Sequence, residues 1–228
     1  MTTRPTNYKA QPGPLSAKDL RKVVALGKRL ERHIHASKAA AVELMDFYAT
    51  RGMDEPAKHN AKALIGSFDD PGQRADACVN VGLHMERAGR FELAVWAYSS
   101  GVALEPTAPD LWYWLNNNLG FSLNQVGRHV EAEPCCRTAI RSQPHRYNAH
   151  KNLGVSLEGQ GNILAAAQAY IMAVQLQPRD LRAFQHLLLL EESYREELRV
   201  EAPAVNEFIE THIRGARERV EQRADVKE

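Results

Sequence analysis

The amino-acid sequence predicts an all-α protein, a solenoid of stacked helical hairpins, and three observations support this fold class. Four landmark residues recur along the chain. Each occurs three times, with a first interval of 38 residues and a second of 34. Aromatic residues make up only 7% of the 228 residues, which is low for a β-sandwich or barrel and ordinary for packed helices. Hydrophobic residues at 44% and charged residues at 25% are typical of a soluble globular chain. The landmarks are Gly82, Gly120 and Gly154; Gly89, Gly127 and Gly161; Ala94, Ala132 and Ala166; and Pro106, Pro144 and Pro178.

The repeated unit resembles the tetratricopeptide repeat (TPR), whose period of about 34 residues equals the second of the two intervals. Three copies carry the motif, at residues 75–108, 113–146 and 147–180. The small Gly and Ala landmarks let the two helices of one copy, helix A and helix B, approach closely, and the Pro landmark stops helix B. The resemblance implies a right-handed α-solenoid in which neighbouring hairpins complete each other's core.

Further helices are expected on both sides of the three repeats. Residues 1–15 hold three Pro and few apolar side chains, so we expect a disordered tail there. We expect N-terminal helices over 16–74, which begin with a capping-box pattern at Ser16 and include a decayed repeat at 38–71. Residues 181–222 are expected to form capping helices at the other end. The first interval is longer than the second by four residues, about one helical turn, which predicts a longer first helix in the second copy.

The formal net charge is only +1, but the charges are unevenly distributed. Near-neutrality argues against a nucleic-acid binder, which usually has a strong basic excess. Residues 1–40 hold nine basic and two acidic side chains, a net of +7. Residues 41–190 hold 13 and 15, a net of −2, and residues 191–228 hold seven and 11, a net of −4. A solvated helix face is the simplest explanation of the basic segment. Contact with RNA, an anionic membrane surface or the acidic C-terminal end stays open.

Cysteine usage and hydropathy predict a cytoplasmic protein. The chain has three cysteines without CxxC spacing, which indicates a reducing compartment. No apolar run approaches the roughly 18 residues of a membrane span. The first residues lack the apolar stretch of a secretory signal. We therefore expect a cytoplasmic location without a membrane span.

The candidate binding surface is the concave groove that the resemblance to TPR proteins implies. In that family, positions two, five, six and nine of helix A face the groove, and position six is Asn in all three copies: Asn80, Asn118 and Asn152. A carboxamide has one acceptor and two donors, so it can hold both the C=O and the N–H of an extended peptide. The row resembles the asparagine ladder in the TPR region of O-GlcNAc transferases, which grips a peptide backbone. Solvated Asn on a polar face is the alternative.

Other groove positions carry side chains suited to specificity. They are Trp114, Asn117 and Phe121 in the second copy, Asn148 and Lys151 in the third, and Arg182 in the half-repeat that follows. Aromatic side chains beside basic groups suit a peptide with an apolar side chain and a carboxylate. For Trp114, packing on the preceding helix is an equal alternative to an exposed contact surface.

Together these features predict a non-enzymatic adaptor that binds an extended segment of a partner protein. The alternative function is an oligomeric scaffold or a dedicated cytoplasmic chaperone that uses the convex surface and the end helices, and this alternative includes a homo-oligomer. The chain has no Gly-rich phosphate loop, HExxH motif or serine-nucleophile elbow. Cys136 takes a position that is buried in the TPR motif. We therefore expect no catalytic residue, no metal, no cofactor and no nucleic-acid partner.

Overall fold

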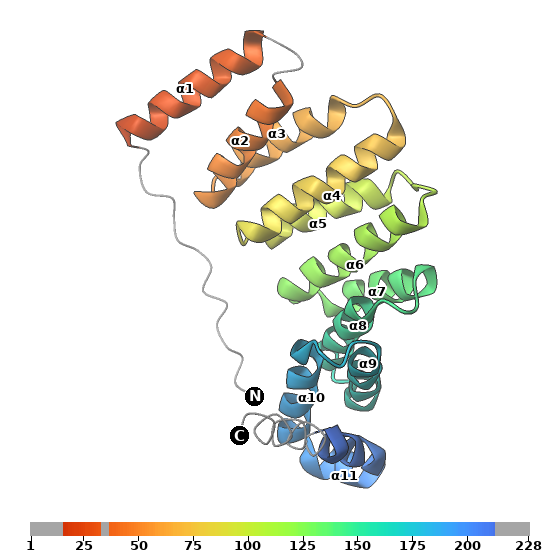
Figure 1. The fold of residues 1–228 in the computed structure, drawn as a ribbon. Helices are drawn as coiled ribbons and strands as arrows, with labels where there is room; N and C mark the ends of the chain where they lie inside the picture. The colour runs from red at the N-terminus through yellow and green to blue at the C-terminus, as the bar shows by residue number, and fades with distance from the viewer. Residues whose placement is uncertain (1–15, 33–36, 213–228) are drawn as a thin grey trace, which may run out of the picture. The chain divides into compact units, whose positions relative to one another are not determined.

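The computed structural model describes residues 16–32 and 37–212. Over these residues the chain forms helices and no strand (Figure 1). Contacts between Cα atoms divide the chain into two compact units, residues 1–115 and 116–228, and the boundary lies inside one helix. None of the described helices is both long enough and apolar enough to cross a membrane. The predicted tail at 1–15 and the end of the predicted capping region, 213–222, lie outside the described residues.

The first unit consists of five helices and the start of a sixth among the described residues. They are α1 (Ala17–Arg32), α2 (Ser37–Thr50), α3 (Asp54–Gly66), α4 (Pro71–Arg87), α5 (Phe91–Val102) and the beginning of α6 (Pro109–Gln125). Successive helices pack as hairpins, α2 with α3 and α4 with α5. The core between them consists mostly of small and aliphatic side chains such as Ala57, Ala94 and Val81, all fully buried.

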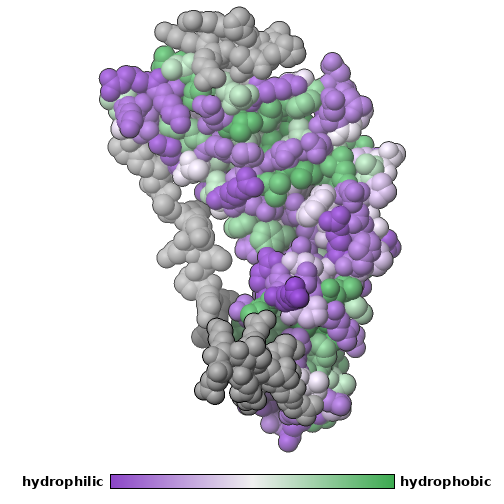
Figure 2. All heavy atoms as spheres, in the orientation of Figure 1, coloured by the Kyte–Doolittle hydropathy of each residue, from purple (hydrophilic) through white to green (hydrophobic). Residues whose placement is uncertain are grey.

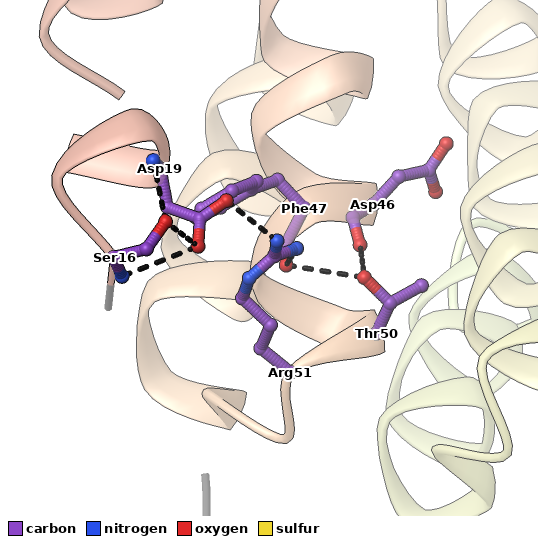
Figure 3. A network of polar contacts seen from close by, with 6 residues as sticks. All are labelled: Ser16, Asp19, Asp46, Phe47, Thr50 and Arg51. Carbon is purple, nitrogen blue, oxygen red and sulfur yellow. Dashed lines mark hydrogen bonds and ion pairs between the residues drawn. The ribbon is translucent and has the colours of Figure 1, made fainter. Parts of the chain in front are cut away.

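Helix α1 is held on α2 by polar and apolar contacts together (Figure 3). The Ser16 hydroxyl accepts a hydrogen bond from the Asp19 amide at 3.2 Å, as the capping-box pattern predicts. Arg51 donates from Nη2 to Asp19 Oδ1 at 2.8 Å, and its guanidinium lies 3.9 Å from the centroid of the Phe47 ring. Further along α1, Leu26 is buried in a cluster with Ala40 and Leu44 of α2. These contacts fix which side of α1 faces the rest of the unit.

The second unit continues the same hairpin pattern. It contains the rest of α6, then α7 (His129–Ser142), α8 (Tyr147–Gly159), α9 (Ile163–Leu176), α10 (Leu181–Ser193), α11 (Arg195–Glu201) and a further helical segment at 203–212. Helix α8 packs on both α7 and α9, and α10 packs on α9. Helix α6 has 17 residues where α8 has 13, so the four residues that lengthen the first interval lie in a longer helix, as predicted.

The repeated glycines have two different structural roles. A Cβ on Gly82 would lie 2.3 Å from the Tyr98 ring, and one on Gly154 would lie 2.4 Å from the Tyr170 ring, so these glycines permit the close approach of helix A to helix B. The second set, Gly89, Gly127 and Gly161, has φ of 69°, 80° and 79°. A side chain is disfavoured in this left-handed conformation, which ends helix A and turns the chain toward helix B. The landmarks of the repeat are therefore requirements of the fold.

Candidate functional site

The predicted groove residues lie on the A helices of both units. Asn80 is on α4 and Trp114 on the early part of α6, both in the first unit. The second unit holds the other seven residues on α6, α8 and α10: Asn117, Asn118, Phe121, Asn148, Lys151, Asn152 and Arg182. On the face drawn in Figure 2, hydrophilic side chains cover much of the described helices, and hydrophobic ones lie between them.

The two predicted site residues of the first unit are exposed. Asn80 donates from Nδ2 to the carbonyl oxygen of Asp76 at 3.1 Å and to its carboxylate at 3.2 Å, one turn earlier on α4. Trp114 has 38% of its surface exposed, and its ring lies edge-on to Tyr113 with centroids 5.2 Å apart. Both side chains are accessible to a partner.

The other asparagines of the predicted ladder are buried in the second unit. Asn118 and Asn152 are 8% and 4% exposed, and the neighbouring Asn117 is 5% exposed. Asn152 donates from Nδ2 to Asn117 Oδ1 at 3.1 Å, and Asn117 donates to Asn118 Oδ1 at 2.9 Å. The three amides thus link α6 to α8. These amides are hydrogen-bonded to one another within the second unit. A ladder that grips a peptide backbone stays a prediction.

Two further buried polar side chains, Asn124 and Ser156, extend this network, and neither was predicted from the sequence. Asn124 donates from Nδ2 to the carbonyl oxygen of Asn152 at 2.8 Å and accepts at Oδ1 from the Ser156 hydroxyl at 3.1 Å. His129 Nδ1 lies 3.1 Å from the same Oδ1 atom. The signal in the sequence is a polar residue directly after Leu123 and another directly before Leu157. The network satisfies buried donors and acceptors between α6 and α8.

The structure brings together a ring and two cations from three consecutive A helices, which we call the aromatic–basic cluster: Phe121 on α6, Lys151 on α8 and Arg182 on α10. The Lys151 Nζ atom lies 5.9 Å from the centroid of the half-buried Phe121 ring. Burial lowers the pKa of Lys151 and the nearby charge of Arg182 lowers it further, while the charge of Asp180 raises it. Within the described residues, Lys151 forms no ion pair. The cluster therefore holds a partly desolvated ammonium group without a bound carboxylate.

Arg182 is positioned by neighbouring polar groups. It donates from Nη2 to the Tyr147 hydroxyl at 2.9 Å and from Nε to Asp180 Oδ1 at 2.9 Å. Tyr147 in turn donates to Asp180 Oδ2 at 2.6 Å. These hydrogen bonds, that of Arg182 first, hold the pKa of Asp180 well below its usual value. The guanidinium keeps an exposed side, so it can contact a partner while it stays attached to the loop before α10.

His186 and Asn148 complete this side of the unit. The His186 ring stacks on Tyr170 at 5.2 Å between centroids and 11° between planes. Burial lowers the pKa of His186, and Lys151 lowers it as well. Asn148 is half-exposed on α8, three residues before Lys151, a spacing that places both on one side of the helix. The cluster thus combines two cations, an aromatic ring and neutral hydrogen-bonding groups.

The reactive groups to consider among the described residues are metal-ligand clusters and activated thiols. Among the described residues, no group of three His, Cys, Asp or Glu side chains is placed to hold a metal ion. Burial raises the pKa of the Cys136 thiol to about 12 and that of Cys78 to about 11. A thiol with such a pKa is a poor nucleophile near neutral pH. The geometry described above is suited to recognition of another molecule.

Comparison with known proteins shows the class of fold. No protein-family model matches the chain, and no curated protein sequence matches it. Solved structures do: MamA from Desulfovibrio magneticus RS-1, residues 41 to the end, is 17% identical with a TM-score of 0.57, and the match covers 80% of this chain and 96% of that one. A second MamA crystal structure is 20% identical with a TM-score of 0.56, covering 78% and 97%.

The similarity extends to eukaryotic proteins. The Hsp90 co-chaperone Cns1 from Saccharomyces cerevisiae is 19% identical with a TM-score of 0.53, over 70% of this chain and 49% of that one. The first TPR domain of human RPAP3 is 18% identical with a TM-score of 0.50, over 57% and 98%. The chain therefore has a TPR-like, all-α solenoid fold. These identities are too low to show more than the fold.

Proposed function

We propose that this protein is a non-enzymatic interaction module that binds an extended segment of a partner protein along the A helices of its repeats. The observation that carries the proposal is the aromatic–basic cluster of Phe121, Lys151 and Arg182, in which three successive A helices present complementary groups on one unit. The same type of fold occurs in Cns1, which is an Hsp90 co-chaperone and therefore a protein that works with another protein.

The chemistry of the cluster indicates an acidic partner segment with an apolar side chain. Removing an ammonium group from water is unfavourable unless a partner compensates it, and Lys151 has no carboxylate bound to it among the described residues. A carboxylate of the partner would supply that compensation and form charge-assisted hydrogen bonds, which are the stronger class. The adjacent Phe121 ring offers contact area for an apolar side chain.

The remaining predicted site residues have supporting roles in this proposal. Asn148, beside Lys151 on α8, offers an amide for the partner's backbone. Asn80 and Trp114 offer an exposed amide and an exposed ring on the first unit. Each neutral hydrogen bond would contribute only about 0.5–1.5 kcal/mol, so the charged and aromatic contacts carry most of the selectivity. Asn117 and Asn152 would bind peptide only by exchanging their present hydrogen bonds, and Asn118 is accessible over only 8% of its surface.

Selection from a random peptide library tests the proposal without a known partner. Wild-type protein is expected to enrich peptides that carry an acidic residue next to an apolar one. The variant Lys151→Gln removes the charge and keeps a polar side chain that is one methylene shorter, and we expect it to bind the selected peptides at least about tenfold more weakly, which corresponds to about 1.4 kcal/mol. Selected peptides without acidic residues, or equal binding by the variant, would contradict the proposal.

A matched control separates the cluster from general charge. Arg137 is an exposed base on the B helix α7, paired with Glu133 at 2.8 Å. Arg137→Gln removes the same unit of charge from the same unit of the protein, and peptide binding is expected to stay at the wild-type level. Asn80→Ala tests the ladder, because Asn80 is exposed and its loss leaves no buried group unsatisfied.

A further inference from the structure

Helix α1 has an exposed side that the first unit does not cover. Leu20 and Val24 lie four residues apart and are 51% and 55% exposed, while Leu26 packs inward at 4%. Arg21 is exposed between the two apolar residues. The Asp19–Arg51 ion pair, drawn in Figure 3, and the contact of Leu26 with α2 set the rotation of α1, and Leu20 and Val24 stay exposed in that orientation. We call Leu20, Arg21 and Val24 the basic face.

The end of the described chain carries the opposite charge. Residues 191–212 hold two basic residues, both in ion pairs within their own segment, and seven acidic residues. On α11, Glu197, Val200 and Glu201 share one side of the helix by their spacing. All three are exposed, and Val200 has the largest exposure, 75%, of the large hydrophobic residues in the described chain. We call these three residues the acidic face.

We propose that the basic face of α1 in one copy of this protein binds the acidic face of α11 in a second copy. The described helix α1 holds six basic and two acidic residues, and one of those acids, Asp19, is already bound by Arg51. The basic face thus presents two exposed aliphatic side chains and the acidic face presents one, and the flanking charges are opposite. Burial of Leu20, Val24 and Val200 would remove apolar surface from water, which favours association.

Charge also decides the type of assembly. Two copies of the basic face would repel each other, as would two copies of the acidic face, so pairing of identical faces is disfavoured. Pairing of unlike faces leaves one free face at each end, and assembly continues head to tail until it closes into a ring or forms a chain. Attraction between exposed charges weakens with salt, since the screening length falls from about 10 Å at 0.1 M to about 3 Å at 1 M. Assembly should therefore grow with protein concentration and shrink with salt.

Two variants and their mixture test the proposal. Arg21→Ala with Val24→Ala removes two of the three residues of the basic face, and Glu197→Ala with Val200→Ala removes two of the three of the acidic face. Alanine favours helix at all four exposed positions. By sedimentation velocity at low salt, each variant alone is expected to be monomeric, while wild type forms larger species at the same concentration. A 1:1 mixture is expected to form a dimer and nothing larger, because only one intact pair of faces remains.

The control and the contrary outcomes are equally specific. Lys62 is exposed on α3, and Lys62→Ala is expected to assemble as wild type does. Wild type that stays monomeric over the accessible concentrations at low salt would overturn the proposal. A monomer in which the basic face binds the acidic face of the same chain would give this result and would overturn it equally. Variants that assemble as well as wild type would overturn it too, as would a mixture that stays monomeric. None of these results bears on peptide binding by the aromatic–basic cluster.

Discussion

Replacement of Gly154 by alanine has two opposite effects on the free energy of unfolding. Gly154 lies inside α8, where alanine is intrinsically more favourable for a helix by about 1 kcal/mol. The added Cβ would lie 2.4 Å and 2.5 Å from two ring carbons of Tyr170, against about 3.4–4 Å for ordinary contact. The ring is fully buried and cannot swing into solvent, so α8 and α9 must move apart. The close packing of this hairpin predicts that the clash outweighs the gain in propensity.

The magnitude follows from the contacts of the ring. Inserting a methyl group into a well-packed core costs about 1–3 kcal/mol. Displacement of Tyr170 also strains its 2.5 Å hydrogen bond to Glu158 and its stacking on His186, which adds about 1 kcal/mol. After subtraction of the propensity gain, the free energy of unfolding should fall by about 1–3 kcal/mol. With a urea m-value of about 2 kcal/mol per M, the midpoint falls by about 0.5–1.5 M.

Urea unfolding followed by helical circular dichroism measures this loss. Gly66→Ala is the matched control, because a Cβ there meets nothing within 4 Å, and this variant should gain about 0.4–1 kcal/mol. The double variant Gly154→Ala with Tyr170→Leu should lose less unfolding free energy than the sum of the losses of the two single variants, since the clash is then absent. If Gly154→Ala unfolds at the same or higher urea concentration than wild type, the tight approach of α8 to α9 is not as described.

Three other predictions concern single side chains. Asn124→Ala removes one donor to the buried Asn152 carbonyl and the Oδ1 atom that Ser156 and His129 contact, and it should cost about 1–3 kcal/mol of unfolding free energy. The exposed Asn80→Ala should cost less than about 0.5 kcal/mol, and equal losses would contradict the difference in burial. The pKa of Asp180 is lower in the folded than in the unfolded chain, so its stabilising contribution is present above about pH 4 and is lost as the pH falls. Asp180→Asn should therefore lower stability at pH 7 and make stability less dependent on pH below 4, and urea midpoints at several pH values check this. Cys78 and Cys136, with pKa values raised to about 11 and 12, should react slowly with iodoacetamide at pH 8 in the native protein and quickly in urea; rapid native labelling by peptide mass analysis would refute their burial.

The hairpin architecture was predictable because its requirements are local. The glycine at each turn must adopt a positive φ, and the small residue on helix A must admit the ring or thiol of its own helix B. Both partners lie within one repeat, so the period of the repeat carries them in the sequence. The longer α6 followed in the same way from four additional residues, which is about one turn.

The asparagine row was less predictable because its partners lie on another helix. The resemblance to the repeat family places position six on the groove side. Once α6 and α8 pack together, however, the amide of Asn152 finds an acceptor in the side chain of Asn117 on α6. The buried Asn152 amide donates to Asn117, and this contact matters because an unpaired buried amide is costly. Asn80 has no such neighbour among its described contacts and stays exposed beside Asp76. One repeated residue type therefore has two environments.

The sequence alone determined the fold class, the helix-turn glycines and the uneven charge of the two ends, because each of these depends on composition or on contacts within a single repeat. Only the tertiary structure decided which of the predicted groove side chains are accessible, and that Phe121, Lys151 and Arg182 come together. It also decided which side of α1 stays exposed, since the Asp19–Arg51 pair orients that helix. The accessibility of a side chain depends on how helices from different parts of the chain pack together. The spacing of residues within one helix does not predict that packing.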